Sequence, residues 1–271
     1  MFFIRLLSGA VLLGAAVLLC FFGNIWLLLI TGLLSLIGNY ELLRVFRMEK
    51  NPLGIVVYLT TIGYYALLHF GWQDWSIAII LPLMLLALLT IYVIRYPKDT
   101  IDSVTKALFS FLYVSVLLSF IYQTRCINQG QWLVWLIIIG SWGSDTCAYC
   151  VGMLIGKHHL SELSPKKTIE GCIGGVLGAG IIAYIFAFFF PLQDAYTVIR
   201  HPHLVFPVVA VVCALVSQVG DLAASAIKRN YEVKDYGTVI PGHGGVLDRF
   251  DSVIFVAPFV YYLLFLAAFI L

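Results

Sequence analysis

Long apolar runs, separated by short charged or glycine- and proline-rich segments, dominate this sequence. Of its 271 residues, 62% are hydrophobic and 11% are charged, whereas a typical soluble domain is about 45–50% apolar and about 25% charged. No globular core could hide this excess, and a membrane-spanning helix needs about 20 consecutive apolar residues. The pattern therefore predicts an all-α, polytopic integral membrane protein, and it excludes a soluble globular protein and a disordered chain.

The apolar runs predict nine membrane-spanning helices, at residues 4–22, 24–43, 53–70, 75–95, 104–122, 132–153, 171–190, 204–224 and 252–271. We interpret the first run as a retained span, because bulky leucines precede Cys20 where a cleaved signal would require small residues. No soluble domain remains between the runs, so residues 1–271 are expected to form a single transmembrane domain. Within it, residues 1–130 are expected to be mainly membrane scaffold with dimer- or lipid-facing helices, and residues 131–271 the catalytic half.

Basic residues favour one side of this arrangement. With the N-terminus in the cytoplasm, all 16 Lys and Arg residues except Arg125 and Arg200 fall in cytoplasmic segments. Cytoplasmic loops of membrane proteins are enriched in Lys and Arg, so the distribution predicts this orientation. The net charge of only +2, without a long basic run, excludes a nucleic-acid-binding protein.

Polar residues enter the predicted helix at 204–224. Asp221 lies within it or at its end, and a carboxylate near the bilayer centre costs about 2.5–3.5 kcal/mol and by default marks a functional site. At 100° per residue, one polar stripe is expected along the helix, formed by Ser217, Asp221, Ser225 and Lys228. Such a stripe needs a polar counterpart: a water-filled cavity, a metal ion or a charged ligand.

A glycine-rich segment follows this helix. Gly244 and Gly245 allow the backbone to approach a ligand closely, successive N–H groups there can bind phosphate, and His243 could donate to an anion. Asp248 and Asp251 then lie three residues apart on one helix face. Carboxylates beside Lys and Arg at a membrane surface suit Mg²⁺ with substrate phosphates.

A second polar segment surrounds the predicted helix boundary near residue 170. Asp145 lies within the span at 132–153, so the same membrane argument applies to it. The Ser-Pro-Lys-Lys-Thr sequence before the next span is typical of a helix start. Lys166 and Lys167 there oppose the helix dipole, so they are candidate phosphate ligands, with anchoring to anionic lipid headgroups as the alternative. Glycines at GxxxG spacing then indicate close helix packing, at Gly171, Gly174, Gly175 and Gly178.

Residues 225–251, SAIKRNYEVKDYGTVIPGHGGVLDRFD, resemble the signature of the phosphatidate cytidylyltransferases, also called CDP-diacylglycerol synthases. A second block agrees: residues 145–149 and 164–171 are similar to another characteristic stretch of that family. Cys147 stands where the family usually has glycine, and Cys150 replaces a usual aromatic residue. Both changes leave the polar residues in place.

The resemblance implies transfer of CMP from CTP to phosphatidic acid, giving CDP-diacylglycerol and pyrophosphate in phospholipid biosynthesis. It also implies dependence on Mg²⁺, with room for a monovalent cation such as K⁺, and a homodimer in the membrane. The fitting location is a bacterial cell (inner) membrane with the active site facing the cytoplasm. Two alternatives stay open: a CTP-dependent kinase or cytidylyltransferase acting on an isoprenoid or other lipid, and a transporter.

The residues and the resemblance together assign expected roles. The expected catalytic residues are Asp145, Asp221, Lys228, Asp248 and Arg249. The expected substrate- and phosphate-binding residues are Lys166, Lys167, Ser225, Arg229, His243, Gly244 and Gly245. The expected metal ligands are Asp221, Asp248 and Asp251.

Overall fold

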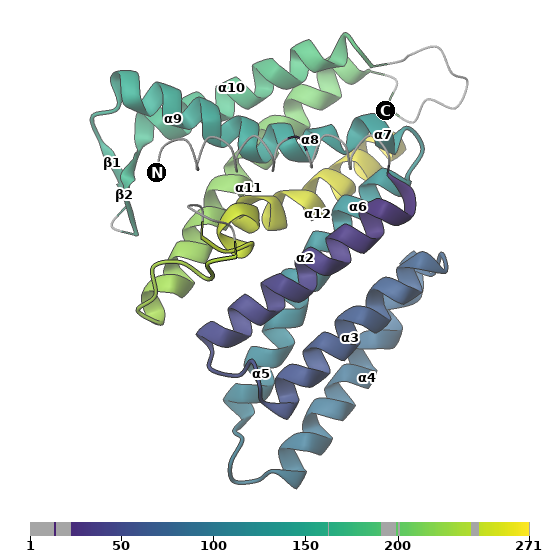
Figure 1. Cartoon of the computed structure of the whole chain (residues 1–271). Helices are drawn as coiled ribbons and strands as arrows, with labels where there is room; N and C mark the ends of the chain where they lie inside the picture. Colours follow the sequence, from purple (N-terminus) through teal and green to yellow (C-terminus); the bar gives the residue numbers. More distant parts are fainter. Residues whose placement is uncertain are drawn as a thin grey trace. The chain divides into compact units, whose positions relative to one another are not determined.

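The computed structural model of this chain describes Gly14 and residues 23–161, 163–190, 199, 201–239 and 244–270. Apart from one antiparallel hairpin, the regular structure in these ranges is helical (Figure 1). The elements in chain order are α2 (Asn24–Val45), α3 (Pro52–His69), α4 (Gln73–Ile94), α5 (Ile101–Ser110), η1 (Phe111–Val116), α6 (Leu117–Cys126), α7 (Gly130–Leu133), α8 (Trp135–Ile138), η2 (Ile139–Gly143), α9 (Ser144–Ile155), β1 (His159–Ser161), β2 (Ser164–Thr168), α10 (Ile169–Ala187), α11 (Pro202–Asn230) and α12 (Leu247–Ile270).

Eight helical stretches in the described ranges are long and apolar enough to cross a membrane. Two of them are composite: Ile101–Cys126 contains α5, the π-helical turn η1 and α6, and Gly130–Ile155 runs from α7 through the π-helical turn η2 to α9. The all-α, polytopic membrane fold is therefore confirmed. The span predicted at 4–22 lies outside the described residues except for Gly14, so the count of nine and the orientation stay predictions.

The chain packs into two compact units. The first comprises Met1–Tyr122 and Tyr231–Arg249, and the second comprises Gln123–Asn230 and Phe250–Leu271. The segment between α11 and α12 thus groups with the N-terminal helices. The division into a scaffold (1–130) and a catalytic half (131–271) stays a prediction, because packing alone does not say which part is catalytic.

Hydrogen bonds between helices join the core of the first unit. The Asn39 side chain on α2 donates to the Ser115 hydroxyl at 2.7 Å and to the Thr61 hydroxyl at 3.2 Å, and it accepts from the Ser110 hydroxyl at 3.0 Å. All four residues are buried. Polar contacts of this kind hold membrane helices together, because the helices gain little from burying apolar surface that lipid already solvates. They fix α2 and α3 against α5 and η1.

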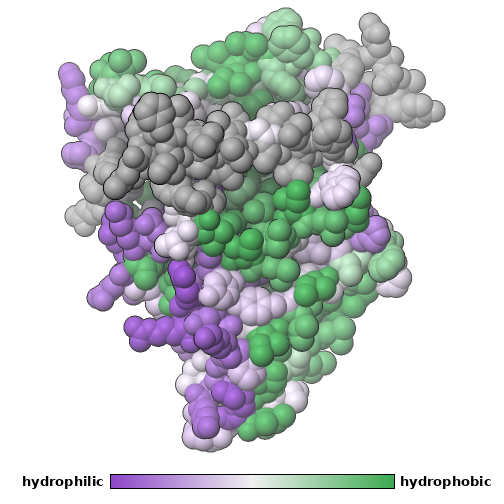
Figure 2. Space-filling view, viewed as in Figure 1, coloured by the Kyte–Doolittle hydropathy of each residue, from purple (hydrophilic) through white to green (hydrophobic). Residues whose placement is uncertain are grey.

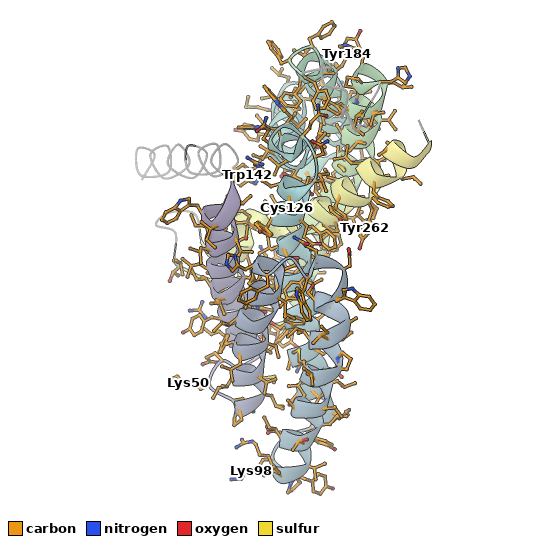
Figure 3. The ribbon with its side chains drawn as sticks, turned by 90° about the vertical axis from the view of Figure 1, so that its right-hand side faces the viewer. Lys50, Lys98, Cys126, Trp142, Tyr184 and Tyr262 are labelled. Atoms are coloured by element: carbon orange, nitrogen blue, oxygen red, sulfur yellow. The ribbon has the colours of Figure 1, made fainter. Side chains whose placement is uncertain are left out.

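Hydrophilic and hydrophobic residues occupy different parts of the surface of the first unit. Figure 2 shows hydrophilic residues gathered at one end of this unit and hydrophobic residues along α3 and α4. Exposed side chains on those helices include Leu59, Ile62, Leu83 and Leu86. Figure 3 places Lys50 and Lys98, from the α2–α3 and α4–α5 connections, at the same end of the helices. Both connections were predicted to lie on one side of the membrane, and this arrangement agrees.

A buried carboxylate ties those two connections together. Asp99 accepts hydrogen bonds from Asn51 Nδ2 at 2.8 Å and from Arg95 Nε at 2.5 Å. Asn51 also caps α3, since its Oδ1 accepts from the Leu53 N–H at 2.9 Å. Burial acts to raise the pKa of the Asp99 carboxyl, but the hydrogen bonds from Asn51 and Arg95 outweigh it and hold the pKa below its ordinary value.

An Asp99→Asn variant is therefore expected to lower the thermal stability of the protein at pH 7. A carboxyl whose pKa is lower in the folded state stabilises the folded protein fully at pH values above its pKa in the unfolded chain, about 3.9. This contribution is lost as the pH falls through the lower pKa of the folded state. The difference in melting temperature between wild type and variant should thus shrink below about pH 4. Thermal unfolding in detergent across this range tests it, with Asp102→Asn at an exposed helical ion pair as control. A difference that stays constant at all pH values would contradict the assignment.

Helices α9 and α10 pack closely against each other in the second unit. A Cβ added at Gly174 would lie 2.5 Å from the Cβ of Val151, and one added at Gly178 would lie 2.6 Å from the Cβ of Cys147. At Gly175 the nearest atom would be the Ser144 carbonyl oxygen, at 2.8 Å. The close packing predicted from the GxxxG spacing is confirmed.

The segment before α10 differs from expectation. Ser164–Thr168 forms strand β2, which pairs with β1 so that His159 lies opposite Thr168 and Ser161 opposite Ser164. The helix begins only at Ile169, and the Thr168 hydroxyl caps it by accepting from the Gly171 N–H at 3.1 Å. The prediction of a helix start at Ser-Pro was wrong, because Thr168 supplies the cap. Lys166 and Lys167 therefore lie on a strand that leads to the helix.

Candidate functional site

Three aspartates in the second unit form what we call the acidic cluster: Asp145, Asp221 and Asp251. Asp145 lies in the first turn of α9, directly after η2, while α11 carries Asp221 and α12 carries Asp251. The charge of Asp145 interacts with that of Asp221, and the charge of Asp251 interacts with both. The prediction that intramembrane aspartates mark one polar site is consistent with this arrangement.

Basic and hydroxyl side chains contact the acidic cluster. The Lys167 ammonium on β2 pairs with the Asp221 carboxylate at 2.6 Å, and Lys167 also interacts with Asp145. The charge of Lys228 acts on Asp251. The Ser252 hydroxyl donates to Asp145 Oδ2 at 3.3 Å. Strand β2 thus brings a lysine to a carboxylate on α11, a contact that the expected helix start did not anticipate.

Glycine explains how α11 and α12 approach beside these carboxylates. A Cβ at Gly220 would lie 2.9 Å from the Phe255 ring and 3.0 Å from the Asp251 carbonyl oxygen. Gly220 directly precedes Asp221, so this contact brings Asp221 and Asp251 into the same region. The predicted stripe on α11 forms part of one continuous helix. Its first member, Ser217, is fully buried, and its hydroxyl has no hydrogen-bond partner among the described residues.

The two ends of the glycine-rich segment meet at Asp248 in the first unit. Asp248, in the first turn of α12, accepts hydrogen bonds at one oxygen from the Tyr236 N–H at 2.8 Å and from the Gly245 N–H at 2.9 Å. Gly244 has a φ of +87°, which favours glycine. We call Tyr236, Gly237 and residues 245–248 the loop base. It brings the two ends of the segment together and orients the Asp248 carboxylate.

The predicted site residues are thus distributed over both units. The second unit brings together Asp145, Lys167, Asp221, Lys228 and Asp251, and it also contains Ser225 and the exposed Arg229. The first unit contains Gly244, Gly245, Asp248 and Arg249. His243 and the side chain of Lys166 lie outside the described residues. Their roles stay predictions.

The sequence reasoning missed two residues of this constellation. Ser252 was not considered, although it follows Asp251 directly. Glu41 on α2 is 1% exposed and accepts backbone hydrogen bonds from Val246 and Leu247, each at 2.9 Å. Because Glu41 lies near the end of the run predicted at 24–43, the argument that singled out Asp145 and Asp221 also applied to it.

The donor set of the acidic cluster fits a hard divalent cation. It offers carboxylate oxygens, which Mg²⁺ prefers, and Mg²⁺ is usually held by one or two carboxylates plus substrate phosphates. Within the described ranges, no group of three or more His, Cys, Asp or Glu side chains is close enough to hold a metal by itself. A metal here would therefore share its coordination with a ligand or with water.

Fold and site define a polytopic membrane protein whose helices carry a charged, oxygen-rich polar site. The model of the cytidylyltransferase family matches residues 3–267, and the chain belongs to this family. A phosphatidate cytidylyltransferase of Bacillus subtilis (strain 168) is 32% identical over 272 residues, covering 96% of each chain. One of Staphylococcus haemolyticus (strain JCSC1435) is 32% identical over 261 residues, covering 94% of this chain and 96% of the relative. The resemblance seen in residues 225–251 is thereby confirmed.

Proposed function

We propose that this chain is a phosphatidate cytidylyltransferase, which transfers CMP from CTP to phosphatidate and releases pyrophosphate. The observation that carries the proposal is the match to relatives of that name over nearly the full length of both chains. The acidic cluster with its lysines is the kind of site that the reaction requires. The eight helical stretches of the described ranges that are long and apolar enough to cross a membrane suit a lipid substrate.

The proposed transfer reaction explains why the site carries both acidic and basic side chains. Phosphatidate and CTP are both anions, and the lipid phosphate must attack the α-phosphate of CTP in line with the departing pyrophosphate. Positioning and charge stabilisation dominate such reactions, so no Ser or Cys nucleophile is needed. Lys167 and Lys228, which already neutralise part of the acidic cluster, would bind phosphate oxygens. Arg249, Arg229 and Lys166 are proposed as further phosphate ligands, with Ser225, His243, Gly244 and Gly245.

We propose that Asp221 and Asp251 hold Mg²⁺ and that Asp145 supports this site. Mg²⁺, when bound, neutralises the triphosphate and stabilises the leaving pyrophosphate. Asp248 is proposed as a further ligand from the sequence motif. The monovalent cation, the homodimer, the bacterial inner membrane and a site facing the cytoplasm complete the proposal.

Purified protein in detergent should transfer the α-phosphate label of CTP to phosphatidate. We expect Mg²⁺-dependent label in the lipid fraction with stoichiometric pyrophosphate release, and no product in EDTA. Label transferred only from the γ-position would instead indicate a CTP-dependent lipid kinase. No lipid label, with phosphatidate and isoprenoid phosphates both supplied, would contradict the proposal and direct the next test to transport.

A further inference from the structure

The buried carboxylate of Glu41 binds the start of α12. One of its oxygens accepts from the Val246 N–H and the other from the Leu247 N–H, each at 2.9 Å. The first N–H groups of a helix have no partner within the helix, and the positive end of the helix dipole lies there. Both oxygens of Glu41 are therefore used on the two residues that directly precede Asp248.

Two glycines of the loop base provide the space for this carboxylate. A Cβ added at Gly245 would lie 2.5 Å from Glu41 Oε1 and 2.6 Å from Oε2, and Glu41 supplies all three of its nearest atoms. A Cβ at Gly237 would overlap Glu41 Oε1. Neither glycine has a positive φ, so backbone conformation does not require glycine here. Glycine is required because the Glu41 carboxylate occupies the space that a Cβ atom would take.

Helix α2 also holds the other end of the loop base. Arg44, one turn beyond Glu41, donates from Nη2 to the Tyr236 carbonyl oxygen at 2.8 Å. The N–H of the same residue donates to Asp248. Arg44 and Asp248 both interact electrostatically with Glu41. One face of α2 thus fixes both ends of the segment that leads to Asp248.

We propose that Glu41 is a positioning residue for the transfer reaction: through Val246 and Leu247 it fixes the loop base, and so the orientation of the Asp248 carboxylate. This inference rests on the proposed function. Glu41 itself contacts neither substrate nor reacting atoms, and it acts through backbone groups. A displacement of about 1 Å in such a segment can cost about a hundredfold in rate.

A Glu41→Gln variant tests the proposal with two readouts. The amide retains one acceptor oxygen but turns an NH₂ group toward a backbone N–H, so one of the two hydrogen bonds is lost. Hydrogen exchange in the peptide covering residues 236–249 should therefore rise. The kcat should fall by about 10- to 100-fold, while the KM for phosphatidate changes by less than about threefold. Glu49→Gln, in the turn between α2 and α3, is the control and should leave exchange and kcat unchanged.

A double-mutant cycle keeps the test decisive if the glutamine variant folds poorly. Gly237→Ala should lower kcat by about tenfold or more when Glu41 is present, and by less than about threefold in a Glu41→Ala background, where the overlap with the Glu41 carboxylate is gone. If the effects of the glycine and Glu41 substitutions on kcat simply multiply in the double variant, the proposal is overturned. A Glu41→Gln variant with normal kcat per folded molecule, whether or not its melting temperature falls, would also overturn it. Absence of transfer by the wild type would instead count against the proposed function.

Discussion

An Asp221→Asn variant is expected to lose CMP transfer by about a hundredfold to a thousandfold while remaining folded. Asparagine has nearly the same volume as aspartate but carries no charge, so it removes the partner of Lys167 without opening a cavity. The lysine and aspartate side chains are each 27% exposed, which limits the cost to folding. Loss of one negative charge also relieves repulsion from Asp145 and Asp251. A large loss of rate would therefore report on chemistry.

The measurement is the initial rate of α-label transfer, with thermal unfolding in detergent recorded on the same sample. Asp74→Asn is the matched control, because Asp74 is an exposed residue in the first turn of α4, and its rate should equal that of the wild type. If Asp221→Asn retains a rate within about threefold of the wild type, Asp221 is not a metal ligand or phosphate-site residue.

Gly174→Ala is expected to destabilise the protein by about 1–3 kcal/mol, although alanine is a better helix former than glycine by about 1 kcal/mol. The added methyl group would lie 2.5–2.6 Å from Cβ, Cγ1 and Cγ2 of Val151. Valine has one strongly preferred rotamer in a helix, and its Cβ cannot move without the backbone. Helices α9 and α10 must therefore separate, and overpacking outweighs the gain in helix propensity.

Gly63→Ala provides the comparison for this effect. Its methyl group would lie 3.4 Å from Ile80 Cδ1, an ordinary contact, so stability should stay equal or rise by up to about 1 kcal/mol. Adding Val151→Gly to Gly174→Ala should recover part of the lost stability. Melting temperatures in detergent measure all of these variants. Equal melting temperatures for Gly174→Ala and Gly63→Ala would contradict the close packing.

The parts of the fold that follow from local pattern were predictable from the sequence. Apolar runs located the helices from α2 onward, and the spacing of Gly174 and Gly178 indicated the α9–α10 contact. The polar stripe on α11 followed from 3.6-residue periodicity. In each case the determining interactions lie within one helix or between neighbouring helices.

The parts that depend on distant contacts were not predictable in the same way. The strand Ser164–Thr168 looks like a helix start, because Ser, Pro and Thr serve at both a cap and a turn. Its role depends on pairing with β1 and on the ion pair between Lys167 and Asp221. Glu41 acts on Val246, 205 residues further along the chain, and no local pattern reports a partner at that distance. The general cost of burying a carboxylate in a membrane was the one available signal.

The long distance in sequence between Glu41 and its two backbone donors has a consequence for biosynthesis. Helix α2 is made early, but the backbone groups that its carboxylate binds are made 205 and 206 residues later. At roughly 5–20 residues per second, the two N–H donors to Glu41 are made on the order of 10–40 s after it. During this interval the Glu41 carboxylate, near the end of a membrane helix, lacks its two backbone donors, and water or lipid headgroups must take their place. The first unit becomes complete only when the start of α12 has been made, so a segment that is synthesised late completes the hydrogen bonding of a helix that is synthesised early.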